Sequence, residues 1–183
     1  TLSLHDALPI YKIYETDVKL TSDGEVVCVN GWNAKTKEKL GVADDEGIFT
    51  YDEFLNLQYY DSHFSTLDFA GLVKLAEKYA DYKFILDVRY NSEKTIPLIK
   101  TIKEMLARSM IKQENFIFQL TDVKSIKYIS KNMPELSIMF DIPSEEEIIE
   151  YNIKDGEIDE ICRKDIVKAI SLRKNIMTTE TID

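Results

Sequence analysis

Short apolar segments alternate with helix-like segments along most of the chain, and this alternation constrains the fold more than any other feature of the sequence. Each apolar segment is followed by a stretch in which apolar residues recur with helical spacing. This order is typical of βα units, in which helices cover a parallel sheet whose strands are buried on both faces. An α/β fold is therefore predicted, with six strands at residues 10–20, 83–88, 115–120, 136–140, 157–162 and 175–179.

Helix start signals lie between these strands. Thr50 with Glu53, and Ser144 with Glu147, match the capping box, in which a hydroxyl and a carboxylate satisfy the first backbone N–H groups of a helix. The polar stretch 33–47 is predicted to be a long loop. No glycine-rich phosphate loop is present, which argues against a Rossmann or P-loop domain. Helices are expected at residues 50–57, 66–79, 92–106, 122–129, 144–149 and 165–172.

Two architectures fit six strands in 183 residues. A (β/α)8 barrel needs eight strands and about 250 residues, so this chain would be an incomplete TIM-type barrel that lacks the first and last strands. A smaller open α/β sheet fits the same count. Residues 1–9 do not lead naturally into the first strand. They are interpreted as a non-native or disordered leader, and residues 10–183 as one partial barrel domain.

Composition limits the classes of partner. The formal net charge of −10 argues against nucleic acid or an anionic membrane surface as the main partner. No run of residues is long and apolar enough to span a bilayer, and the sequence leaves open whether the protein is cytoplasmic or exported. Cys28 and Cys162 form neither a disulfide framework nor a zinc pattern, so free thiols in apolar surroundings are expected.

Two carboxylates, Glu15 and Asp17, lie one residue apart on the first predicted strand. Side chains at i and i+2 of a strand point to the same face, so these like charges project together. Such a pair is unfavourable unless a cation lies between the two groups, and oxygen ligands suit Mg²⁺ or Ca²⁺. The alternative is that the pair is an ordinary solvated strand edge in an acidic chain.

A third carboxylate, Asp87, closes the strand predicted at 83–88. Residues at the carboxyl ends of the strands of a parallel barrel face its active site, so Asp87 would join Glu15 and Asp17 on one rim. Arg89 lies two residues further on and could bind a phosphate beside the metal with its guanidinium group. The alternatives are a local ion pair between Asp87 and Arg89, or a loop cap made by Asp87.

The segment from Tyr14 to Val27, with the pattern E-x-D-x-x-x-T-x-D-G-x-x-V, resembles a segment of the glycerophosphodiester phosphodiesterases. It most resembles their bacterial relatives, grouped with the phosphatidylinositol-specific phospholipase C-like phosphodiesterases. Residues 49–55 and 65–67 resemble the stretch leading into the family's next barrel helix. Residues 84–89 resemble the strand with its third metal ligand. The similarity covers nearly everything from residue 10 onward and is only general after Arg89.

The resemblance implies a TIM-barrel phosphodiesterase of lipid metabolism that cleaves glycerophosphodiesters to an alcohol and glycerol phosphate. It also implies one divalent cation, Mg²⁺ or Ca²⁺. Glu15, Asp17 and Asp87 match the family's metal ligands. Arg89 matches the basic residue that holds the phosphate, which is usually Lys.

The chain departs from the family at both histidines that transfer protons. Asn30, in Val29-Asn30-Gly31-Trp32, occupies the position of the second histidine, and an amide cannot act as a general acid or base. The first histidine has no counterpart, because His5 lies too close to Glu15 and His63 lies in a loop far from both motifs. Since loss of one acid–base group costs about 10²–10⁴-fold in rate, we expect weak or no hydrolysis.

Three functional interpretations follow from the sequence. The first is a truncated and impaired phosphodiesterase. The second is a catalytically inactive relative that binds a phosphate-bearing ligand, a sugar or a partner protein. The third is an unrelated α/β domain whose carboxylates are surface charges. For an incomplete barrel, the unpaired edge strands predict self-association.

Overall fold

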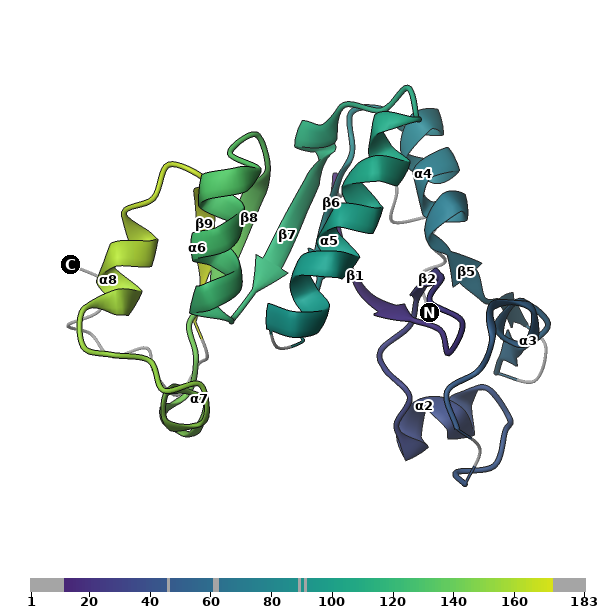
Figure 1. The fold of residues 1–183 in the computed structure, drawn as a ribbon. Coiled ribbons are helices and arrows are strands. Elements are labelled where there is room, and N and C mark those ends of the chain that lie inside the picture. Colours follow the sequence, from purple (N-terminus) through teal and green to yellow (C-terminus); the bar gives the residue numbers. More distant parts are fainter. Residues whose placement is uncertain (1–11, 46, 61–62, 89, 91, 173–183) are drawn as a thin grey trace.

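The computed structural model describes residues 12–45, 47–60, 63–88, 90 and 92–172. A seven-stranded sheet with the order β5-β2-β1-β6-β7-β8-β9 forms its centre (Figure 1). Neighbouring strands from β1 to β9 are parallel and follow one another in chain order, which is the winding of a barrel wall. These parallel strands are β1 (Ile13–Leu20), β6 (Lys83–Asp87), β7 (Phe116–Leu120), β8 (Ser137–Asp141) and β9 (Val167–Ser171).

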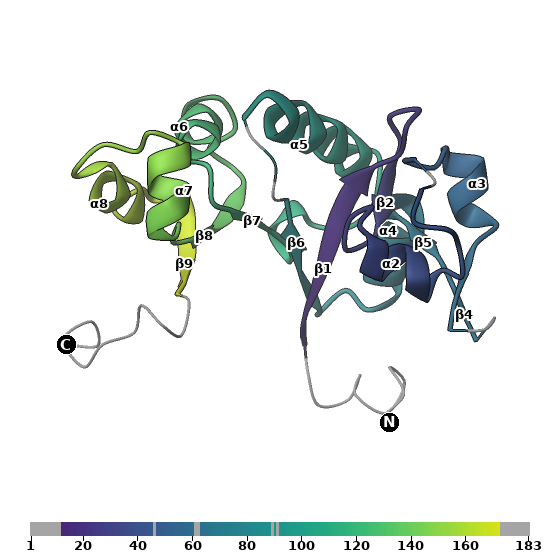
Figure 2. The same ribbon diagram turned by 90° about the horizontal axis from the view of Figure 1, so that it is seen from below.

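The main core lies between one face of this sheet and the helices. In the central strands every second residue, such as Phe84, Leu86 and Phe118, points into this core and is almost completely buried. Figure 2 shows α5 and α6 on the same side of the strands. The helices that supply buried residues to this core are α4 (Phe69–Lys78), α5 (Ser92–Ala107), α6 (Val123–Asn132) and α8 (Glu157–Cys162).

The opposite face of the sheet is different. Its apolar side chains Ile85, Ile117 and Met139 are only half-buried. Coverage by helices on one face is typical of a barrel wall, whereas a doubly wound sheet has helices on both faces. The sheet does not close within the described residues, because β9 lies at the end opposite to β5 (Figure 1). The prediction of an incomplete barrel is therefore confirmed.

The sequence-based assignment is wrong in three places. Residues 33–47 are not entirely loop, because they contain helix α2 (Ala34–Lys39), which Asn33 caps by accepting a hydrogen bond from the Thr36 backbone. Residues 157–162, expected as a strand, form α8, and residues 165–172, expected as a helix, contain β9. Ile158 and Ile161 are three residues apart, which is the spacing of one helix face. The acidic residues between and beside them resemble the apolar–polar alternation of a strand, so the helix was missed.

These corrections exchange one predicted strand for another, so they leave the count of parallel strands within the described residues unchanged. The described residues contain five of them, compared with six in the prediction. The strand expected at 175–179 and the leader at 1–9 lie outside the described residues.

Both predicted capping boxes are confirmed. Thr50 and Glu53 begin α3 (Tyr51–Leu55), and Ser144 and Glu147 begin α7 (Glu145–Glu150). Asp122 caps α6 as expected, by accepting from the backbone of Lys124 and Ser125. Helix α4 begins three residues later than predicted, with Asp68 as its N-cap. The short 3₁₀ helix η1 (Gln113–Asn115) precedes β7.

The chain between β2 (Val26–Cys28) and α4 has a small core of its own. Trp32 packs edge-on against Phe49 and Phe54, and its indole N–H donates to the Leu20 carbonyl at 3.0 Å. This contact fixes the segment against the end of β1. The segment also contains β3 (Gln58–Tyr59), β4 (Phe64–Ser65) and β5 (Leu67–Asp68).

Two further expectations concern cysteines and membranes. Cys28 is buried, Cys162 is half-buried, and both are free thiols. Burial raises the pKa of the Cys28 thiol to about 12. Among the helices of the described residues, none combines the length and the apolar content needed to cross a membrane.

Candidate metal centre

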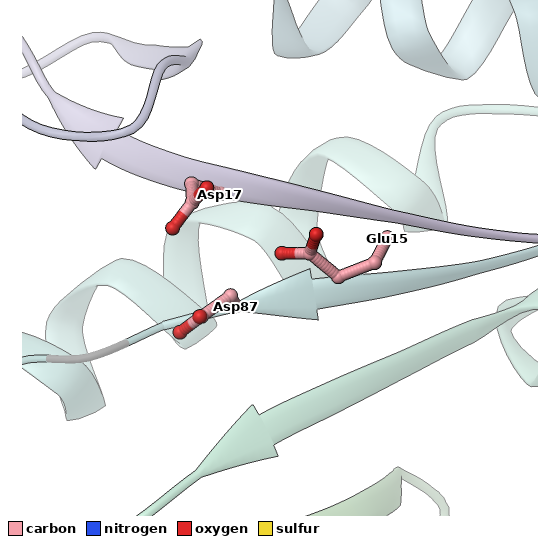
Figure 3. Close-up of side chains that lie close together, drawn as sticks. All are labelled: Glu15, Asp17 and Asp87. Atoms are coloured by element: carbon pink, nitrogen blue, oxygen red, sulfur yellow. The ribbon is translucent and has the colours of Figure 1, made fainter. Parts of the chain in front are cut away.

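The structure brings Glu15, Asp17 and Asp87 together on the face of the sheet that the helices leave uncovered (Figure 3). Asp17 and Asp87 are direct partners in the parallel register of β1 and β6, and Glu15 lies two residues earlier on β1. One carboxylate oxygen from each residue lies within 4.8 Å of the others. The i, i+2 spacing and the end of a neighbouring strand therefore place three acidic groups at one point.

Burial differs sharply within this acidic triad. Asp87 is only 1% exposed, whereas Glu15 is exposed and Asp17 is intermediate. A buried carboxylate next to two others is costly unless a cation compensates the charge. Ca²⁺ binds oxygens at 2.3–2.6 Å, so two of its ligands lie at most about 5 Å apart, and the observed spacing fits a common ion. The three carboxylates could thus hold a metal ion.

Asn30 lies directly beside the acidic triad. Its side-chain amide donates a hydrogen bond to Asp17 Oδ2 at 2.5 Å. The backbone N–H of Val29 donates to the Asp17 carbonyl at 3.0 Å, so the chain leaving β2 runs along the end of β1. The amide orients the Asp17 carboxylate, but an amide does not titrate near neutral pH and so cannot act as a general acid or base.

The T-x-D-G part of the sequence pattern serves the hairpin between β1 and β2. Thr21 Oγ1 donates to Asp23 Oδ1 at 2.6 Å, and the same oxygen accepts from the Tyr51 backbone at 2.9 Å. The hydrogen bond from Thr21 lowers the pKa of the Asp23 carboxyl group. Gly24 has a φ of +90°, a backbone conformation that residues with a Cβ atom rarely adopt, so glycine suits this turn. These residues hold the scaffold of the centre and lie outside the acidic triad.

The remaining predicted residues are not part of the triad. Arg89 and His5 lie outside the described residues. His63 is exposed in the turn between β3 and β4.

Sequence reasoning missed Lys19 and Tyr90, which lie at the same end of the sheet. The Lys19 ammonium group is 5.1 Å from the centre of the Tyr90 ring. Lys19 follows Asp17 by two residues, so the spacing that identified the acidic pair also places this lysine on the same face.

The sequence matches no protein-family model and no curated protein. Solved structures do match. A phosphodiesterase from Oleispira antarctica, in complex with the product sn-glycerol-3-phosphate, has a TM-score of 0.71 at 13% identity, over 97% of this chain and 70% of that chain.

Two further matches come from Parabacteroides distasonis. One glycerophosphodiester phosphodiesterase has a TM-score of 0.59 at 14% identity, over 92% of this chain and 82% of its own. A glycerophosphoryl diester phosphodiesterase has a TM-score of 0.54 at 18% identity. The match covers 82% of this chain and 52% of that phosphodiesterase, so the chain spans about half of the length of that protein. The chain therefore has the fold of the glycerophosphodiester phosphodiesterases, in the form of an incomplete TIM-type barrel.

Proposed function

We propose that this chain is a metal-dependent phosphodiester hydrolase of the glycerophosphodiester phosphodiesterase type, with impaired turnover. Its reaction would cleave a glycerophosphodiester to an alcohol and glycerol phosphate. The observation that carries the proposal is the acidic triad at the ends of two neighbouring strands, in a fold whose solved examples include phosphodiesterases. One of those examples was solved with sn-glycerol-3-phosphate.

Glu15, Asp17 and Asp87 would hold one divalent cation, Mg²⁺ or Ca²⁺. A bound cation supplies Lewis acidity that neutralises the charge of a phosphodiester. Mg²⁺ binds oxygens at 2.0–2.1 Å, so its ligands lie at most about 4.2 Å apart, and Ca²⁺ tolerates the wider spacing better. Arg89 would hold a phosphate oxygen beside this site through its guanidinium group.

The impairment follows from Asn30. A histidine at this position could take or give a proton, but the Asn30 amide only donates a hydrogen bond to Asp17. The same contact favours a second candidate function. A site with its carboxylates in place and no proton-transferring group would bind a phosphate-bearing ligand or partner without cleaving it.

The interpretation of the carboxylates as surface charges has less support. Asp87 is 1% exposed, so it is not a surface residue. Self-association through the open edges of the sheet stays part of the proposal, since Ile170 on the terminal strand β9 is 48% exposed.

A hydrolysis assay tests the proposal. The full chain is incubated with a glycerophosphodiester and either Mg²⁺ or Ca²⁺, and release of glycerol phosphate is measured. We expect little turnover, and any turnover should disappear in Asp17→Ala. Robust hydrolysis that depends on Asp17 would contradict the impairment and support the enzyme. Without turnover, binding of glycerol 3-phosphate that requires the metal would favour the inactive relative.

A further inference from the structure

Tyr90 is held at the end of the sheet that carries the acidic triad. Its hydroxyl accepts a hydrogen bond from the Leu20 backbone at the end of β1, at 3.4 Å. Its own carbonyl accepts from Thr95 Oγ1 in α5 at 2.9 Å. The ring is half-buried and packs on the main core, and burial raises the pKa of its hydroxyl. Tyr90 is therefore a neutral, fixed platform between β1 and α5.

Two lysines from different elements converge on this one ring. The ammonium groups of Lys19, in β1, and Lys94, in α5, lie 5.1 Å and 5.9 Å from its centre. Either distance is within the range of a cation–π contact. The two ammonium groups concentrate positive charge at one ring, in a chain whose net charge is −10. This arrangement has an electrostatic cost, because like charges repel each other.

The position of Lys94 adds to this concentration. It lies in the first turn of α5, where the free backbone N–H groups already carry partial positive charge. A lysine there is at the unfavourable end of the helix dipole, and acidic residues are preferred. The helix dipole thus gives no reason for a positive charge at this position.

Lys19 connects this ring to the candidate metal centre. It lies two residues after Asp17 on β1, so the two Cα atoms are about 7 Å apart and the side chains share a face. Its Cε lies 4.0 Å from the position of a Cβ on Gly31, next to Asn30. Lys19 therefore lies next to the acidic triad, and the shared Tyr90 ring places Lys94 at the same end of the sheet.

We propose that Lys19 and Lys94 form a subsite for a second anionic group, a phosphate monoester carried by the alcohol part of a phosphodiester ligand. This inference rests on the proposed function, because it assumes that the phosphodiester itself binds at the triad. A cation at the triad would offset the carboxylate charge, so the positive charge around Tyr90 would attract an anion. The same two ammonium groups disfavour a cationic substituent such as choline.

Calorimetry on the full chain, with saturating Ca²⁺, tests the proposal with two probes. Glycerophosphoinositol 4-phosphate carries the second anionic group, and glycerophosphocholine carries a cation in its place. We expect the first probe to bind about tenfold more tightly. Lys19→Met and Lys94→Met should each reduce that preference about fivefold, and Lys19→Arg should retain it. The preference should also fall with ionic strength.

Lys100→Met is the matched control. Lys100 is also in α5 and lies 5.3 Å from the centre of another ring, Tyr128, so its loss removes a comparable contact and one charge. It should leave the preference unchanged. Equal affinities in the wild-type chain, no binding of either probe, or a preference that survives in the double variant would each overturn the subsite.

A separate measurement isolates the proposed function. Ca²⁺ is titrated into the ligand-free chain, and unfolding is followed. If Ca²⁺ fails to stabilise the chain while the phosphorylated probe still binds through Lys19 and Lys94, the metal centre is wrong and the subsite stands. If Ca²⁺ stabilises the chain and the probes bind equally, the subsite is wrong and the metal centre stands.

Discussion

Leu86 and Asp87 are adjacent in β6 and almost equally buried, at 0% and 1% exposed, but they lie on opposite faces of the sheet. Leu86 packs into the core beneath the helices. Asp87 meets the carboxylates of Glu15 and Asp17. Burial of Leu86 stabilises the fold by itself, because apolar surface leaves water. Burial of Asp87 beside like charges opposes folding unless other groups compensate the charge, and a cation at this face would do so.

The two faces therefore carry different information. Residues on the face beneath the helices contribute to folding, and they can be replaced by other apolar residues of similar volume. The other face carries the acidic triad, and the proposed metal site would tie its residues to a particular charge and geometry. Variants on the two faces should separate these roles cleanly.

The largest effect is expected on the face beneath the helices. Leu86→Ala should lower the free energy of unfolding by about 3 kcal/mol, because it removes buried methyl groups and leaves a cavity. Ile85→Ala, one residue earlier on the half-buried face, should cost about 1 kcal/mol. Urea unfolding measures both. Equal losses for the two variants would contradict the difference between the faces.

The next effect concerns proton transfer at the triad. Asn30→His places a titratable imidazole where the amide now contacts Asp17. We expect hydrolysis of a glycerophosphodiester to rise about 10²-fold with the metal present, the lower end of the range for one acid–base group. Asn30→Gln, which keeps the amide, is the control and should show no gain. A gain shared by both variants would indicate that removal of the Asn30–Asp17 hydrogen bond is responsible.

Local sequence signals predicted most of the sheet and the residues of the triad. The βα alternation identified strands β1, β6, β7 and β8, and the i, i+2 rule with a strand end brought Glu15, Asp17 and Asp87 together. Both signals depend on side-chain periodicity, which is fixed by backbone geometry.

The failures have a different physical cause. Residues 157–171 contain short elements of ambiguous periodicity, so tertiary packing of Ile161 into the core decides between strand and helix. The convergence of Lys94 on Tyr90 with Lys19 depends on the register of β1 and β6. Local patterns carry no information about that register.

A smaller effect concerns the metal. Asp87→Asn removes one charge from the triad at nearly constant volume. In the wild-type chain, Ca²⁺ at about thirty times its Kd should raise the free energy of unfolding by about 2 kcal/mol, and the variant should lose that gain. Without metal, removal of one of three like charges should offset part of the cost of the substitution. Chelation by EDTA should return the wild type to its metal-free stability.

Asp141→Asn is the matched control for this experiment. Asp141 is a buried carboxylate, 5% exposed, at the carboxyl end of β8, and it is not among the three residues of the triad. It should keep the stabilisation by Ca²⁺. If Asp87→Asn keeps the stabilisation as well, the metal is bound elsewhere.

The smallest effect concerns a carboxylate that accepts hydrogen bonds from two protein groups. Asp68 accepts hydrogen bonds from the Tyr51 hydroxyl at 2.6 Å and from the Gly71 backbone at 2.8 Å. The bond to Asp68 raises the pKa of Tyr51 to about 12, from a model-compound value of 10.0. Because the folded-state pKa is the higher one, this contribution to stability is complete below pH 10 and is lost as the pH rises towards 12.

Tyr51→Phe should therefore lower the free energy of unfolding by about 1 kcal/mol at neutral pH, and the difference from the wild type should shrink above pH 10. Cys28, with a pKa of about 12, ionises over the same range in both proteins, so its effect cancels in the difference. Urea unfolding from pH 7 to pH 11 measures this difference. A difference that stays constant up to pH 11 would show that lost packing, and not the hydrogen bond to Asp68, sets the stability of this segment. Metal should leave the difference unchanged, because Asp68 is satisfied by protein donors and lies outside the triad.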